Sequence, residues 1–236
     1  SRLTEVLLLR GDIGAALASS EESIRLMESV GGPAGTFWPW YQRGRLLWQI
    51  GANVAAVDVY RQLPHSPAWS EFARPAVDFY VQAFRLPQDP AGVAEALGQL
   101  PSRGEHSHYD ERDVRYWRGL SLSLCGDLHG AWSLVGELPA PPFNLHAAVI
   151  EALRLRVSLA LGSSLDDRIS AARVHFGHSP PLETIEIGQV LERSLISVGH
   201  RREAGRVAKA VAALTESLAA TIVDDRLRAQ FLTLRR

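Results

Sequence analysis

The stretch from Trp40 to Tyr60, WYQRGRLLWQIGANVAAVDVY, decides the fold. Its first half has apolar residues three and four positions apart, as in an amphipathic helix, and Gly51 follows this run. Because glycine readily adopts the left-handed conformation that ends many helices, we expect the chain to turn there and begin a second helix. Gly44 and Ala56 are small, so the backbones of the two helices can cross closely. The stretch predicts an antiparallel helix pair.

The same pattern recurs along the chain. Two further junctions between apolar runs fall at Pro87 and Gly162, and successive junctions lie 36 to 40 residues apart. A nearly constant step of this size predicts a helical solenoid. Four junction glycines each have an alanine five residues later: Gly11, Gly51, Gly126 and Gly199.

At these positions the chain resembles the tetratricopeptide repeat family. The third and fifth units have lost most of the pattern, Arg115 replaces a large apolar residue in the fourth, and the steps exceed the family's length of about 34. The resemblance therefore implies a divergent right-handed α-solenoid, similar to the repeat region of large multidomain bacterial regulators. The family's positions match Trp40, Gly44, Leu47, Gly51, Ala56 and Tyr60 in the second unit, and Gly119, Leu122, Gly126, Leu128 and Ala131 in the fourth.

The chain as a whole is expected to be all-α, because no period-two apolar run bounded by turn residues occurs. We expect a single domain of six helix pairs with a short C-terminal capping helix. It starts at Ser1, within a segment that already has helical period, so we expect a piece of a longer protein. The units are 1–32, 33–66, 67–104, 105–142, 143–180 and 181–223, with the cap at 224–236.

Helix boundaries follow from turn and capping residues. Asp12 and Asp89 are candidate N-caps, and Pro75 should start or kink its helix. The last segment has Leu227, Phe231 and Leu234 on one face, which would cover the apolar end of the stack. The predicted helices are one ending near Arg10, then Ile13–Val30, Trp38–Ile50, Asn53–Leu63, one ending near Leu86, Pro90–Leu100, Glu111–Leu124, Leu128–Leu138, Leu145–Leu161, Leu165–His175 (or from Ser164), Leu182–Val198, Arg201–Ala220 and Asp224–Leu234.

Composition narrows the class of protein. The chain of 236 residues is 46% hydrophobic and 22% charged with a formal net charge of -1, which gives no overall field to attract nucleic acid or an anionic membrane. Uncharged stretches are too short to span a bilayer, and no signal segment opens the chain. Cys125, the only cysteine, lies in an apolar run and is expected to be buried. We expect a cytoplasmic protein.

Catalytic motifs are missing from the sequence, so we expect neither an enzyme nor a cofactor. His106 and His108 could hold a metal, but a polar connector favours solvated side chains, and we expect no metal site. Glu183 and Glu186 lie three residues apart and could form an acid–base pair. Their polar neighbours favour a hydrated helix face instead. The loop that we expect around His175 and His178 favours a solvated pair as well.

A concave groove is the expected binding site, because the leading helices of tetratricopeptide-like stacks line one. Arg45, Arg156 and Arg193 fall at the same repeat position, so we expect them to align along one wall. Trp38 and Trp48 could equally fill the core, whereas Trp40, Trp117 and Trp132 are expected there. Trp, Tyr and Arg dominate binding hot spots, and an acidic or carboxylate-ended peptide would suit this groove. The candidate partner-binding residues are Trp38, Tyr41, Arg45, Trp48, Arg74, Phe84, Tyr116, Arg156 and Arg193.

The sequence thus predicts a noncatalytic protein-interaction module within an intracellular signalling or transcription regulator. Its partner would be a protein or peptide, including other domains of the same parent chain, and neither nucleic acid nor a membrane. Self-association through the first unit is a further expectation. The alternative is a small-molecule sensor domain of a transcription regulator, with the Trp-rich second unit forming a pocket for a sugar or an aromatic inducer.

Overall fold

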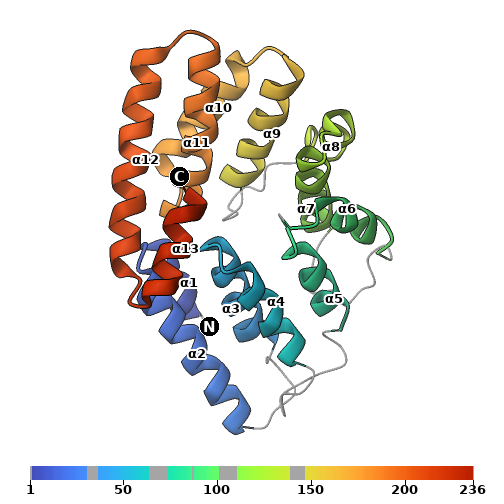
Figure 1. The fold of residues 1–236 in the computed structure, drawn as a ribbon, viewed down its shortest axis with the longest axis vertical. Coiled ribbons are helices and arrows are strands. Elements are labelled where there is room, and N and C mark those ends of the chain that lie inside the picture. The colour runs from blue at the N-terminus through green and yellow to red at the C-terminus, as the bar shows by residue number, and fades with distance from the viewer. Residues whose placement is uncertain are drawn as a thin grey trace.

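The described part of the chain is entirely helical. The computed structural model describes residues 2–30, 37–63, 74–86, 88–100, 111–138 and 147–235, and within them it contains thirteen α-helices and no strand. The expected all-α class is therefore confirmed (Figure 1). The helices are α1 (Arg2–Leu9), α2 (Ile13–Val30), α3 (Phe37–Gln49), α4 (Asn53–Gln62), α5 (Arg74–Ala83), α6 (Pro90–Gly98), α7 (Glu111–Leu124), α8 (Leu128–Val135), α9 (Ala147–Leu161), α10 (Asp166–His178), α11 (Pro181–Ser197), α12 (Arg201–Thr221) and α13 (Asp225–Arg235).

Turns between paired helices are made by the glycines that the sequence singled out. Within the described ranges a positive φ occurs only at glycine, and at Gly51 and Gly126 it is 84° and 85°. An L side chain rarely adopts this conformation, so glycine is required there. The other three positions are also predicted junctions, namely Gly11, Gly162 and Gly199.

Side-chain caps begin several of the helices. The carboxylate of Asp12 accepts a hydrogen bond of 3.0 Å from the Ala15 N–H, and Asp89 accepts one of 3.0 Å from Gly92. Both predicted N-caps are confirmed. Pro75 occupies the second position of α5, so it starts that helix and does not kink it.

Small residues within two helix pairs make room for close packing. At Gly119 the packing is as expected, but at Gly44 it is not. A Cβ at Gly119 would lie 2.6 Å from Val135 of the partner helix, so this pair does approach closely. At Gly44 the space is filled by the ring of Tyr60, whose Cε2 would lie 2.3 Å from an added Cβ. The small residue in α3 therefore accommodates an aromatic ring and does not serve a direct backbone crossing with Ala56.

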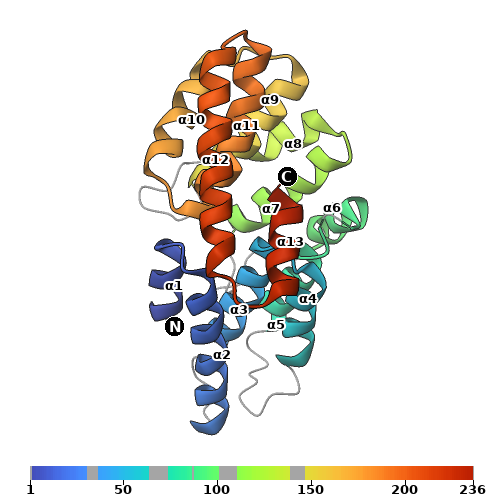
Figure 2. The same ribbon diagram turned by 60° about the vertical axis from the view of Figure 1, so that its left-hand side comes forward.

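Helices adjacent in sequence pack on each other, and the first pair also contacts the last. Packing joins α2 to α12, so the N-terminal pair lies against the lower end of the long α12 in both views (Figures 1 and 2). The Ile13 N–H donates a hydrogen bond of 3.1 Å to the hydroxyl of Thr221, and a Cβ on Gly14 would lie 2.0 Å from the Thr221 carbonyl oxygen. The two ends of the described chain thus meet, which an open stack does not require.

The last helix, α13, does not lie where we predicted. We expected it to cover the apolar end of a stack, but α13 packs on α12 and reaches the α3–α4 turn. Arg235 Nη2 donates a hydrogen bond of 3.0 Å to the Gln49 carbonyl, and Gln189 Nε2 donates one of 2.8 Å to the Arg235 carbonyl. Phe231 is fully buried, whereas Leu234 is 45% exposed. The helix therefore joins two distant parts of the chain.

Two further predictions fail, one at Cys125 and one at the histidines of α10. Cys125 is exposed, because it lies at the helix end where α7 turns into α8. The helix α10 continues to His178, so His175 and His178 are helical and not in a loop.

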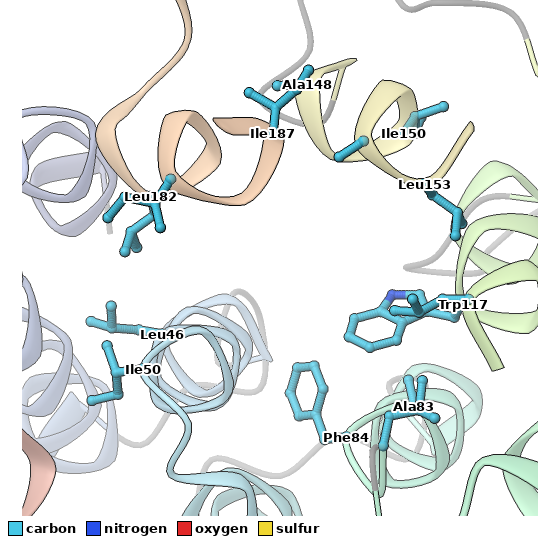
Figure 3. Packing of buried hydrophobic residues seen from close by; sticks show 14 of the residues in the cluster. Leu46, Ile50, Ala83, Phe84, Trp117, Ala148, Ile150, Leu153, Leu182 and Ile187 are labelled. Carbon is cyan, nitrogen blue, oxygen red and sulfur yellow. The ribbon is translucent and has the colours of Figure 1, made fainter. Parts of the chain in front are cut away.

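Leading helices of several pairs contribute to one apolar core. Figure 3 shows Leu46 and Ile50 of α3 near Leu182 of α11, with Phe84 and Trp117 close together on the other side. Because α3, α7, α9 and α11 all turn side chains inward, polar residues on their inner faces also become enclosed.

Candidate functional site

Five of the nine predicted groove residues line one hollow, but the other four do not. The five are Tyr41, Arg45, Trp48, Phe84 and Tyr116. Arg45 lines a cavity between α1, α3 and α11, Arg156 lines a pocket reached by α13, and Arg193 is exposed beside α12. Arg74 is exposed at the start of α5 and lines none of these three hollows. The expected alignment of Arg45, Arg156 and Arg193 along one wall is therefore wrong, because the three side chains line different hollows.

The cavity between α1, α3 and α11, hereafter the α1–α3–α11 cavity, has a volume of about 500 Å³. This falls within the roughly 300–1,000 Å³ typical of small-molecule sites. Each helix contributes both apolar and polar groups to its wall. The lining residues are Arg2, Thr4, Glu5, Leu8, Leu9, Trp38, Tyr41, Gln42, Arg45, Leu46, Gln49, Pro180, Leu182 and Glu183.

Trp38 and Tyr41 give the cavity an aromatic wall. Their ring centroids lie 5.5 Å apart in an edge-to-face arrangement, and Trp38 is 50% exposed. The Tyr60 hydroxyl donates a hydrogen bond of 3.1 Å to the Tyr41 carbonyl, which ties α3 to its partner helix behind the wall. The open question about Trp38 is thus decided in favour of a surface facing a cavity.

Glu183 is the buried polar group of this cavity. Its residue is 5% exposed, and burial raises the pKa of its carboxyl to about 8, with the Arg45 charge opposing the shift and the Glu186 charge adding to it. At pH 7 the side chain is therefore mostly protonated and can donate a hydrogen bond. Burial alone would lower the pKa of Arg45, but Tyr41 and Glu183 outweigh that effect and raise it.

The sequence missed Glu183, for which we expected a hydrated face. Helix α11 packs against α9, α10 and α12, so most of its circumference is covered. A signal was present in the sequence: the positions four and seven residues after Glu183 are Ile187 and Val190, both of which are buried. A carboxylate on an apolar helix stripe indicates burial more strongly than its polar neighbours indicate solvation.

Core packing accounts for most of the other aromatic candidates. Phe84 is fully buried and cannot contact a partner, which corrects its assignment to the groove. Trp48 is half-buried, stacks on Phe84 with centroids 6.0 Å apart and meets Trp117 edge-on at 4.6 Å. Trp40 and Trp117 are buried as expected. Trp132 is partly buried, and the Arg168 guanidinium lies 5.4 Å above its ring.

Tyr116 and Arg156 belong to the polar interior next to this aromatic core. Burial raises the pKa of the Tyr116 hydroxyl well above its ordinary value, the Glu186 charge adds to the shift, and the Arg156 charge opposes it. Both side chains are half-buried. Tyr116 lines the same hollow as Tyr41 and Arg45, and Arg156 lines the pocket reached by α13.

The described residues contain no group of three or more His, Cys, Asp or Glu side chains able to hold a metal ion, and His106 and His108 lie outside these residues. Among the described helices, none has the length and apolarity needed to cross a membrane.

Comparisons with protein-family models, with curated proteins and with solved structures find no match to this chain.

Proposed function

We propose that this chain is a noncatalytic small-molecule sensor domain whose ligand occupies the α1–α3–α11 cavity. The observation that supports this proposal is a cavity of about 500 Å³ with a Trp–Tyr wall, lined also by Arg45 and by the buried carboxyl of Glu183. Sites for organic ligands combine mostly apolar walls with a few fixed polar groups, and this cavity has that composition.

The lining indicates the chemistry of the ligand. Trp38 and Tyr41 offer ring faces and edges to an aromatic ring or a sugar face, while Leu8, Leu9 and Leu182 accept apolar surface. From the same lining, Arg45 can donate hydrogen bonds, and the protonated carboxyl of Glu183 can donate one as well. A ligand with an aromatic or sugar body and one polar acceptor end satisfies both parts of the wall.

Ligand binding would also affect contacts outside the cavity. The cavity joins α1 and α3 from one end of the sequence to α11 from the other, where α2 already meets α12. A ligand that fits only when these helices are close stabilises the contact between the two ends. This coupling is how a sensor domain would transmit occupancy to a parent protein.

Tryptophan fluorescence tests the proposal. Wild-type protein is titrated with monosaccharides and with monocyclic aromatic acids, and a binder is expected to shift the emission of Trp38. Leu9→Phe, which fills part of the cavity, should abolish the response, whereas the matched change Leu3→Phe on the same helix lies outside the lining and should leave it intact. The sensor proposal fails if a Trp38→Phe variant gives the same response as wild type, or if Leu9→Phe and Leu3→Phe bind equally.

A protein-interaction role remains the second candidate, supported by an open trough of about 840 Å³ between α11, α12 and α13. Small residues such as Ala208 and Ala212 form its floor, and Arg193 and Glu216 provide charges at its edge. A partner helix could pack closely there. Ala212→Trp should abolish capture of a protein partner, and unchanged capture would exclude the trough.

In either case we propose that the domain belongs to a larger cytoplasmic signalling or transcription regulator, as the likeness to tetratricopeptide regions implies. The finer geometry of a right-handed solenoid is part of this proposal. It is supported by glycine turns at steps typical of helical repeats and by packing between the leading helices α7, α9 and α11.

A further inference from the structure

A second pocket, hereafter the inner pocket, lies where α13 meets residues of α3, α7, α9 and α11. This inner pocket has a volume of about 200 Å³. Its walls come from both halves of the chain, so it exists only in the closed arrangement described above. The lining residues are Trp48, Gln49, Asn53, Leu86, Leu120, Leu124, Arg156, Glu186, Gln189, Leu234 and Arg235.

Two arginines give this pocket hydrogen-bond donors without acceptors. The Nε atoms of Arg156 and Arg235 are buried and have no hydrogen-bond partner, and within the described ranges neither side chain forms an ion pair. A buried charged donor without a partner is costly, and native structures generally satisfy such groups. The two Nε–H groups therefore lack acceptors, although the lining also holds the Glu186 carboxylate and Gln49 Oε1, which has no hydrogen-bond partner either.

The arrangement is held in place by its neighbours. Arg235 Nη2 donates to the Gln49 carbonyl at 3.0 Å, Gln189 Nε2 donates to the Arg235 carbonyl at 2.8 Å, and the guanidinium lies 5.9 Å from the centre of the Phe231 ring. These contacts fix one guanidinium before any ligand arrives. A fixed donor loses little conformational entropy on binding.

The charge balance of the lining favours an anion. Arg156 and Arg235 are the two cationic side chains in the lining, and Glu186 is the one acidic side chain. Burial lowers the pKa of Arg235, which shows that its charge is poorly solvated, although Glu186 and Tyr116 oppose the shift. An added anion would offset this excess of positive charge.

We propose that the inner pocket binds a small oxyanion, either phosphate or a carboxylate, between Arg156 and Arg235. Guanidinium groups match the oxygens of both anions geometrically, and each can engage two oxygens at once. The volume holds such an anion with a few waters, each of which takes up about 30 Å³. The apolar walls at Trp48, Leu120 and Leu124 would accommodate a small organic remainder. This site is separate from the α1–α3–α11 cavity and does not depend on the sensor role.

Calorimetric titration of the full chain tests the proposal, with inorganic phosphate in one arm and acetate in the other at constant ionic strength. Arg156→Gln should weaken binding about tenfold or more, because charge-assisted hydrogen bonds are the strong ones and a factor of ten corresponds to only about 1.4 kcal/mol. Glu186→Gln removes the competing negative charge and should tighten binding. Arg193→Gln, on the same helix as Glu186 but outside the pocket, is the control and should leave affinity unchanged.

The two titrations show which kind of oxyanion the pocket prefers, because they compare the affinity for phosphate with the affinity for a carboxylate. The proposal is overturned if neither anion binds wild-type protein at millimolar concentration, or if Arg156→Gln and Arg193→Gln bind as wild type does. It is also overturned if Glu186→Gln weakens binding. Leu9→Phe should leave anion affinity unaffected, so failure of the sensor proposal and failure of this one can be told apart.

Discussion

We expect Glu183 to make the stability of this protein depend on pH in an unusual direction. Carboxylates in native proteins more often have lowered pKa values and stabilise the fold as pH rises. Here burial raises the pKa of Glu183 from 4.5 to about 8, so the folded state holds its proton more tightly than the unfolded chain does. The stabilising contribution is complete below pH 4.5 and is lost as pH rises towards 8.

The magnitude follows from the shift. Each unit of difference between folded and unfolded pKa corresponds to about 1.4 kcal/mol, so a rise from 4.5 to about 8 corresponds to roughly 5 kcal/mol over the whole range. Between pH 5.5 and pH 7.5, Glu183 alone should lower the free energy of unfolding by roughly 3 kcal/mol. Glu183→Gln cannot ionise and keeps a similar shape, so this part of the pH dependence should vanish in the variant.

Urea denaturation at pH 5.5, 6.5, 7.5 and 8.5, followed by circular dichroism, measures the effect. Glu183→Gln should become more stable relative to wild type with each step up in pH. The control is Glu192→Gln on the same helix, whose side chain does not line the α1–α3–α11 cavity and whose curve should run parallel to that of wild type. Parallel curves for wild type and Glu183→Gln would refute the reasoning, because they would mean that Glu183 is hydrated in the folded protein.

Two further predictions concern packing. Arg154 is 8% exposed, and its guanidinium donates to the Val135 and Leu138 carbonyls and to Glu151, so Arg154→Met should lower the free energy of unfolding by about 3–5 kcal/mol in urea denaturation. A loss below about 1 kcal/mol would contradict this bond network. Alanine usually stabilises a helix by about 1 kcal/mol relative to glycine. Gly14→Ala should instead destabilise the protein, as measured by thermal unfolding, because its Cβ would meet the Thr221 backbone where the two chain ends join. If Gly14→Ala and the same change at an exposed helical glycine raised thermal stability equally, the two ends of the chain would not be in contact.

Local structure could be predicted from the sequence because its determinants are local. Gly51 requires a left-handed conformation, and Asp12 and Asp89 cap helices through hydrogen bonds that span three residues. Each of these signals acts within one turn of the chain. Helix pairs and their boundaries were therefore within reach of sequence analysis.

Closure of the chain, which is the contact between its two described ends, could not be predicted in the same way. Contact between Gly14 and Thr221 joins residues from opposite ends of the chain, and no periodic pattern specifies it. Closure decides that Arg156 faces an inner pocket and Arg193 faces solvent, although both occupy the same repeat position. Phe84 is buried for a different reason, because the rings of Trp48, Tyr60 and Trp117 from neighbouring helices pack around it. Site predictions that assumed regular repeats failed at these residues.

Crystallography with soaked fragments tests the central claim most directly. Crystals of the wild-type chain are soaked with aromatic acids and monosaccharides, and the electron density is inspected in the α1–α3–α11 cavity. The account predicts a bound fragment with its ring against Trp38 and Tyr41 and its polar end at Arg45 and Glu183. Fragments that bind only elsewhere, or a cavity filled by the protein's own side chains, would contradict it.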